Sequence, residues 1–427
     1  MLIKEVLTSV EVIRDPYIKA VTYAKIGERL ARVREGHYKG SFLRAIETTK
    51  EIEDPVKTFK ALLSIGYSMS KAGIKASKRI YQGVLEDSRA LPAPHRDVVM
   101  ESAAMYMLSL GEIGEAITYA LEISSPKLRN EVLLAAMRTN TRKLGKEGIR
   151  VAYHLRKSKL ALEYIDSEPY HSMGIMELIR AYISLGGYET AITLISQIRD
   201  RDWARQAFKE VAFYMKERDV IGHYIDTLEG VVDDLITRFD EDFAAEMAFA
   251  FALSGEGLPA IELVRKMKNA TDVLLKLVLE LLERDHDVLP SLVAVLNEEE
   301  ATLVGKVVMN RILERPELGS REVVEAIGKS TRNGEVWAKI ARYYILMDEV
   351  DEAMRTASLL HSERLRSVVM ADISHHLLKK GEVERAIDAA IEVRDPDFSS
   401  ILISEILLKA LERELDGKVV PWNGSKH

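Results

Sequence analysis

The chain has 427 residues, of which 47% are hydrophobic and 30% are charged, and its net charge is −7. This balance excludes an intrinsically disordered chain and a membrane-embedded protein. The length exceeds what one ordinary compact core holds, so we expect either several domains or an elongated solenoid. The sequence has no cysteine, which excludes disulfides, thiolate metal ligands and cysteine nucleophiles.

Targeting signals are not evident in the sequence. No apolar run approaches the roughly 20 residues that a membrane-spanning helix requires. The first segment, MLIKEVLTSVEVIRD, places Lys4, Glu5 and Glu11 where a signal peptide needs an uninterrupted apolar core. We therefore expect a cytoplasmic protein that does not bind membranes. The scarcity of glutamine and the abundance of Glu, Lys and Arg are typical of a thermophile.

The first predicted helix starts are Asp15-Pro16 and Asp54-Pro55. An aspartate is a good N-cap, and proline fits the first helical position because its missing N–H costs little there. A short turn-and-helix phrase then recurs along the chain. Its copies are YKGSFLRAI at 38–46, which is weak, SLGEIGEAI at 109–117, SLGGYETAI at 184–192, LSGEGLPAI at 253–261, LMDEVDEAM at 346–354 and KKGEVERAI at 379–387. Such internal repetition indicates stacked helical hairpins.

Each clear copy has the same internal pattern. The turn begins at a residue that is usually glycine, as expected where a helix ends in a left-handed conformation. Five residues later there is always an alanine, which lets the second helix approach the first. Seven residues before the turn there is usually a small residue, which we call the small position; Ile179 breaks this rule. The turn residues are Gly111, Gly186, Gly255, Asp348 and Gly381, the alanines are Ala116, Ala191, Ala260, Ala353 and Ala386, and the small positions are Gly66, Ala104, Ala248, Ala341 and Ser374.

This pattern resembles the tetratricopeptide repeat. The clearest copy is 334–354, in which Trp337, Ile340, Ala341, Tyr344 and Ala353 match signature positions. The second helix is about two residues shorter than the family norm, so other helical-hairpin repeats stay open. The resemblance implies an all-α, right-handed α-α superhelix, that is, a solenoid of stacked antiparallel helical hairpins.

We expect residues 1–413 to form this solenoid from about 10–12 hairpins, with about 20–25 helices and essentially no sheet. The proline-rich segments 88–96 and 315–320 are candidate hinges, and 414–427 is expected to be a flexible tail that contains Trp422. The register of the repeat is unclear in 126–166, 217–240 and 286–332.

The tetratricopeptide resemblance also implies where a ligand would bind. In that family the concave face is lined by the first helix of each hairpin, on the side that is not used for packing. The residues at those places are Tyr67, Glu101, Met105, Met176, Arg180, Phe249, Arg342 and His375. Aromatic, methionine and arginine side chains suit an extended peptide or a helix, and Arg180 and Arg342 could clamp carboxylates.

Charge is distributed unevenly along the chain. Residues 1–160 contain 28 Lys/Arg and 18 Asp/Glu, a net charge of +10, which leaves −17 for residues 161–427. A solvated helical face explains this imbalance as well as a nucleic-acid surface does. In the second case Arg142, Lys143, Arg150 and Lys157 would contact phosphates.

Signals for catalysis are poor. The sequence has no phosphate-binding loop, no dinucleotide fingerprint and no HExxH motif. The neighbours His375 and His376 would point in different directions on a helix, so they do not predict a metal site. We therefore expect no catalytic residue, cofactor or metal.

The sequence thus predicts a non-enzymatic scaffold that binds a protein or peptide in its concave groove. The alternative is a helical-repeat protein that binds nucleic acid through the basic region 1–160. Self-association is also compatible with the asymmetry of charge.

Overall fold

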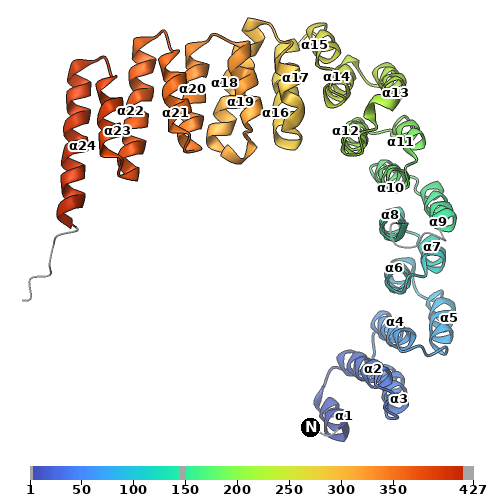
Figure 1. The fold of residues 1–427 in the computed structure, drawn as a ribbon. Coiled ribbons are helices and arrows are strands. Elements are labelled where there is room, and N and C mark those ends of the chain that lie inside the picture. Colours follow the sequence, from blue (N-terminus) through green and yellow to red (C-terminus); the bar gives the residue numbers. More distant parts are fainter. Residues whose placement is uncertain (1–2, 145–150, 417–427) are drawn as a thin grey trace, which may run out of the picture. The chain divides into compact units, whose positions relative to one another are not determined.

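The computed structural model describes residues 3–144 and 151–416, which form 24 α-helices with no strand among them (Figure 1). Contacts divide the chain into two compact units, 1–215 and 216–427. The helices of the first unit are α1 (Ile3–Ser9), α2 (Pro16–Arg32), α3 (Tyr38–Thr48), α4 (Pro55–Lys71), α5 (Ser77–Ser88), α6 (Ala93–Leu110), α7 (Ile113–Leu121), α8 (Pro126–Leu144), α9 (Val151–Glu163), α10 (Tyr170–Ser184), α11 (Tyr188–Ile195) and α12 (Arg201–Glu217), whose last two residues belong to the second unit. Those of the second are α13 (Ile225–Arg238), α14 (Ala244–Leu253), α15 (Gly257–Arg265), α16 (Ala270–Arg284), α17 (Leu289–Val293), α18 (Glu298–Glu314), α19 (Arg321–Ser330), α20 (Gly334–Leu346), α21 (Val350–Ser358), α22 (Glu363–Lys380), α23 (Val383–Ile391) and α24 (Pro396–Asp416).

Both units are built from antiparallel helical hairpins that stack on one another. From α2 onward the even-numbered helices are the first helices of the hairpins, and within each unit a first helix packs on the helix that follows it, as α6 does on α7 and α20 on α21. First helices also pack on first helices, as in α4 with α6 and α20 with α22. The all-α fold of stacked helical hairpins predicted from the sequence is therefore confirmed, and within each unit it is tetratricopeptide-like.

The turn residues adopt the left-handed conformation that the repeat predicts. Gly111 has a φ of 85°, and Gly186, Gly255 and Gly381 are similar. Asp348, which replaces glycine in its copy, has a φ of 65°. Arg34 and Asp219 make the same turn, and the sequence pattern missed both. The weak copy at 38–46 is misaligned, because Gly40 lies inside α3 and the turn is at Arg34.

The alanine of each repeat is completely buried where the two helices of a hairpin meet. All five of these residues have 0% exposed surface, namely Ala116, Ala191, Ala260, Ala353 and Ala386. The predicted N-caps are also present. Asp15 accepts a hydrogen bond from the backbone N–H of Ile18 at 3.1 Å, and Asp54 accepts one from Val56 at 2.8 Å. Local chemistry therefore fixes the ends and the close contacts of the hairpins.

A polar residue one turn inside several first helices holds the loop that leads to the next hairpin. It is the fifth residue of the helix in four cases, Asp97, Asn130, Thr302 and Ser367. The Asp97 carboxylate accepts hydrogen bonds from the backbone N–H groups of Ser124 and Ser125, both at 2.8 Å. Asn130 donates to Ser167 at 2.7 Å, Thr302 bonds with Thr331 at 2.7 Å, and Ser367 accepts from the backbone of Arg394 at 3.3 Å. These bonds satisfy loop groups that neither helix can satisfy.

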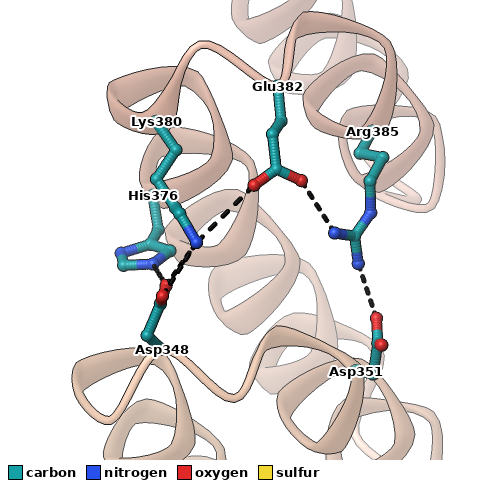
Figure 2. Close-up of polar contacts among 6 residues, drawn as sticks. All are labelled: Asp348, Asp351, His376, Lys380, Glu382 and Arg385. Atoms are coloured by element: carbon teal, nitrogen blue, oxygen red, sulfur yellow. Dashed lines mark hydrogen bonds and ion pairs between the residues drawn. The ribbon is translucent and has the colours of Figure 1, made fainter.

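Polar contacts also join the α20–α21 hairpin to the α22–α23 hairpin. Figure 2 shows that Asp348, at the α20–α21 turn, lies between His376 and Lys380 of α22. Its Oδ1 is 2.9 Å from His376 Nε2 and 2.8 Å from Lys380 Nζ. Lys380, and to a smaller degree His376, lower the pKa of Asp348. The stabilising contribution of Asp348 is therefore present above its ordinary pKa and is lost as the pH falls through the lowered value.

The same network continues along the second helices. Arg385 of α23 donates to Glu382 at 2.7 Å and to Asp351 of α21 at 2.5 Å (Figure 2). Lys380 lies 3.6 Å from Glu382, so the two arms of the network meet at that carboxylate. All these groups are substantially exposed, and such exposed pairs each contribute little to stability.

Asp348→Ala is expected to destabilise the second unit more than Asp348→Gly does. Both variants lose the contacts to His376 and Lys380, but alanine also strains the left-handed turn, whereas glycine relieves it. Chemical denaturation of the full-length variants checks this order. Equal loss in both would show that the polar contacts, and not the backbone, control stability at this turn.

Three segments whose register was unclear are irregular in the structure. The α9 helix has 13 residues, more than the 9 of α7 and the 8 of α11, 3-10 turns precede α13 and α17, and α17 itself has 5 residues. The candidate hinges 88–96 and 315–320 each lie within one unit and stay predictions. Residues 417–427, with Trp422, lie outside the described residues. Among the helices that the structure describes, none combines the length and the apolar character needed to cross a bilayer.

Candidate functional site

Several ion pairs join neighbouring first helices side by side, and we call the following four pairs the first-helix ladder. In the first unit they are Arg138–Glu177 and Arg180–Glu210, and in the second unit Arg342–Asp372 and His375–Glu405. Arg180, Arg342 and His375 were predicted to line a groove. Each stands one residue after the small position of its helix, and each partner lies 30 residues further along, on the next first helix.

Arg180 is the most completely bound member of the ladder. Its Nε and Nη2 donate to the two carboxylate oxygens of Glu210 at 2.6 and 2.9 Å, and its Nη1 donates to Glu177 at 3.0 Å. Bonding to Glu210 raises the pKa of this guanidinium further. The bidentate geometry that was predicted for a ligand carboxylate is therefore used within the chain, between α10 and α12.

Arg342 and His375 are more accessible. Arg342 Nε donates to Asp372 at 2.8 Å, and 45% of the arginine side chain is exposed. His375 Nε2 lies 3.7 Å from the carboxylate of Glu405, whose pKa is lowered chiefly by Lys409 and less by His375. These two positions pair with a neighbour and still present polar surface to solvent.

In the first unit the predicted residues on α4 and α6 are Tyr67, Met105 and Glu101. The rings of Tyr67 and Tyr106 are 5.0 Å apart, and Lys71 Nζ lies 4.6 Å from the Tyr67 ring centre. Met105 is 45% exposed, although methionine is usually buried. Glu101, one turn earlier on α6, is partly buried. This part of the first-helix face offers an apolar contact surface beside a carboxylate.

Two of the predicted groove residues are wrong. Met176 and Phe249 are each only 1% exposed and belong to the hydrophobic core. Met176 lies on the packed side of α10, and Phe249 lies in α14, where nearly every residue is buried. Repeat position alone cannot show exposure when a helix is covered on more than one side.

The acidic partners of the ladder were missed by the sequence interpretation. Glu177, Glu210 and Asp372 each stand two residues before the small position of their own helix, or before Ile179 in α10. Three of the four pairs share a separation of 30 residues between the cation and the acid, whereas Arg138 and Glu177 are 39 residues apart. Adding the 30-residue separation to the repeat alignment would have identified those three pairs.

The residues that were predicted to contact nucleic acid have different surroundings in the structure. Arg142 is exposed at the end of α8, whereas Lys143 Nζ donates to the backbone carbonyl of Gly111 at 3.3 Å. Lys157 Nζ lies 5.7 Å from the ring centre of Tyr153. Arg150 lies outside the described residues. Lys143 thus stabilises the C-terminal end of α6, where a cation is favoured by the helix dipole.

The two adjacent histidines contact different neighbours, His375 on the side of Glu405 and His376 on the side of Asp348. In residues 3–144 and 151–416, no group of three or more His, Asp or Glu side chains could hold a metal ion.

Three cavities lie between successive second helices, on a side of the hairpins that the sequence interpretation did not consider. One of about 500 Å³ is lined by α5 and α7 and one of about 530 Å³ by α9 and α11. The cavity between α19 and α21 is about 990 Å³, and Trp337 of α20 forms part of its wall. The sequence singled out Trp337 only as a repeat-signature residue.

No protein-family model matches the chain, and none of the curated proteins matches it in sequence. Among solved structures, it is similar to Ton1535 from Thermococcus onnurineus NA1, with 16% identity over 90% of this chain and 99% of that chain, at a TM-score of 0.23. It is also similar to a signal-transduction ATPase with a tetratricopeptide repeat sensor from Pyrococcus horikoshii, with 13% identity over 92% of this chain and 74% of that chain, at a TM-score of 0.24. A circular tandem repeat protein has 12% identity over 95% of this chain and 99% of that chain, at a TM-score of 0.24. With TM-scores this low, function is inferred from the chain's own geometry.

Proposed function

We propose that this protein is a non-enzymatic scaffold that binds a peptide segment or a helix of a partner protein along its first-helix face. The observation that carries the proposal is found in each unit by itself, where exposed or partly exposed side chains stand at equivalent positions of neighbouring first helices. They are Tyr67 and Met105 in the first unit, and Arg342 and His375 in the second. Stacked hairpins present such a face as a continuous surface within each unit.

The chemistry of the face differs between the two units, so each unit offers its own contact surface. Exposed Met105 and the Tyr67–Tyr106 pair offer apolar contact in the first unit, and Arg342 and His375 offer charge-assisted hydrogen bonds in the second. Apolar burial would supply most of the binding free energy, and the charged groups would set register. A partner carboxylate would have to compete with Asp372 for Arg342, which favours reversible binding.

An exchange variant tests this proposal while keeping the fold. Arg342→Asp combined with Asp372→Arg preserves the ion pair between α20 and α22 but reverses the charges on the face. Affinity capture from a nuclease-treated lysate of the source organism, with mass spectrometry, compares it with the wild-type chain. We expect proteins that the wild type retains to be lost with the exchange variant.

Two results would contradict the proposal. One is the same set of proteins captured by both forms. The other is capture that disappears on nuclease treatment, which would favour nucleic acid binding through the basic region 1–160. Circular dichroism and thermal unfolding of both forms control for loss of fold.

A further inference from the structure

The cavity between α19 and α21, which we call the α19–α21 cavity, lies wholly within the second unit. Its volume of about 990 Å³ is roughly twice that of either cavity described in the first unit. A site of this size accommodates several side chains of a bound segment. It lies on the second-helix side, so it is separate from the first-helix face of the proposed function.

The floor of the cavity is apolar and held in place. The indole Nε1 of Trp337 donates to the backbone carbonyl of Thr331 at 2.9 Å, which fixes the ring. Ile340 and Tyr344 are buried beside it, whereas Leu359 at the edge is 56% exposed. Gly328 also lines the floor, and a Cβ there would be in ordinary van der Waals contact with Ile340 at 3.4 Å and with the indole at 3.7 Å.

The rim of the cavity carries an excess of positive charge. Four cations line it, against two carboxylates, Glu325 and Glu335. Lys306 pairs with Glu335 at 2.5 Å, Lys329 with Glu325 at 3.6 Å, and Arg355 with Glu352. Arg332 and His361, both exposed, have no carboxylate partner within the described part of the chain. One full positive charge and one imidazole therefore remain available at the rim.

This cationic rim stands in the acidic part of the chain, because residues 161–427 have a net charge of −17. General basicity of the region therefore does not explain it. An apolar floor with an unpaired arginine and an imidazole at its edge complements an acidic chain segment that carries a bulky apolar side chain. We propose that the α19–α21 cavity binds such a segment of a partner protein, with the apolar side chain against Trp337 and a carboxylate at Arg332.

Two other occupants fit less well. A nucleic-acid strand carries a negative charge at every nucleotide, whereas three of the four cations on the described rim are paired with carboxylates and only Arg332 is left to neutralise a phosphate. The chain's own segment 417–427 contains Lys418 and Lys426 and no acidic side chain, so its charge does not complement the rim.

Tryptophan fluorescence tests the proposal directly. Trp203→Phe together with Trp422→Phe leaves Trp337 as the only one of the three tryptophans in the full-length chain. The probes are synthetic peptides in which Asp and Glu surround a single Phe or Leu. We expect saturable binding that shifts the Trp337 emission, and no shift with matched peptides that carry Lys in place of the acids.

Arg332→Glu is expected to weaken that binding by about tenfold or more, because it replaces the unpaired cation with a negative charge that repels the acidic peptide. Lys266→Glu makes the same change of charge at an exposed site of the second unit outside the cavity, and binding should stay within about twofold of the wild type. The absence of a shift with every acidic peptide, or equal weakening by the two variants, would overturn the proposal. So would a labelled single-stranded oligonucleotide that shifts Trp337 when the peptides do not. The Arg342/Asp372 exchange should leave this binding unchanged, so failure here is distinguishable from failure of the proposed function.

Discussion

Asp97→Ala is expected to lower the free energy of unfolding of the first unit by about 2–3 kcal/mol, because it removes an ionised acceptor from two backbone N–H groups. Asp97 is 3% exposed, and its two carboxylate oxygens each bind one N–H of the loop between α7 and α8, at 2.8 Å. Without that carboxylate, the loop that sets the entry of α8 loses both of these bonds to α6. The effect should therefore exceed that of removing any surface pair of the ladder.

Hydrogen-exchange mass spectrometry of the full-length chain checks this expectation, because it resolves the amides of Ser124 and Ser125 from the rest of the unit. Asp97→Asn provides the control, since it keeps one carboxamide oxygen as an acceptor and should give an intermediate loss. Protection of these amides that is unchanged in Asp97→Ala would contradict the assigned role. An Asn variant as unstable as the Ala variant would show that charge, and not the count of acceptors, is decisive.

Gly257→Ala is expected to destabilise the second unit by about 1–3 kcal/mol, because the new methyl group would overlap a backbone that cannot move aside easily. Gly257 begins α15, and a Cβ there would lie 2.8 Å from the carbonyl oxygen of Ser291 and 3.1 Å from the Cα of Leu292. Both atoms belong to α17, so relief requires the two second helices to separate. Only glycine permits this approach.

Gly230→Ala is the matched control for Gly257→Ala. Gly230 lies inside α13 of the same unit and is exposed, and a Cβ at this position would have no neighbouring atom within 4 Å. We expect this substitution to stabilise the unit by up to about 1 kcal/mol through helix propensity. Thermal and urea unfolding of both variants measure the two changes in stability. Equal effects of the two alanines would show that the contact between α15 and α17 does not limit stability.

The features that sequence could predict are those fixed by local chemistry. A left-handed turn demands glycine or a tolerated substitute such as Asp348, and a close helix contact demands alanine, as at Ala353. Asp54 before Pro55 similarly fixes a helix start within a few residues. Each of these constraints acts over one hairpin, so a single copy of the repeat contains the whole signal.

The features that sequence could not predict depend on packing between hairpins. Phe249 occupies the same repeat position as Arg342, yet one is in the core and the other is exposed. Their difference arises from how completely neighbouring helices cover α14 and α20. The α19–α21 cavity likewise depends on the separation of two helices that are not adjacent in the chain. The ladder lies between these cases. The 30-residue spacing of three of its pairs is present in the sequence, but only the register of neighbouring hairpins shows that these residues are partners.

Photo-crosslinking from the first-helix face tests the central claim most directly. A photoreactive benzophenone amino acid is placed at Met105 on α6, and, as the control, at Leu43 on α3, a second helix of the same unit; the two side chains are 45% and 62% exposed. After irradiation in nuclease-treated lysate, a scaffold that binds its partner along the first helices predicts discrete protein adducts from position 105 and few from position 43. Adducts from position 43 alone, or equal yields from both positions, would contradict it.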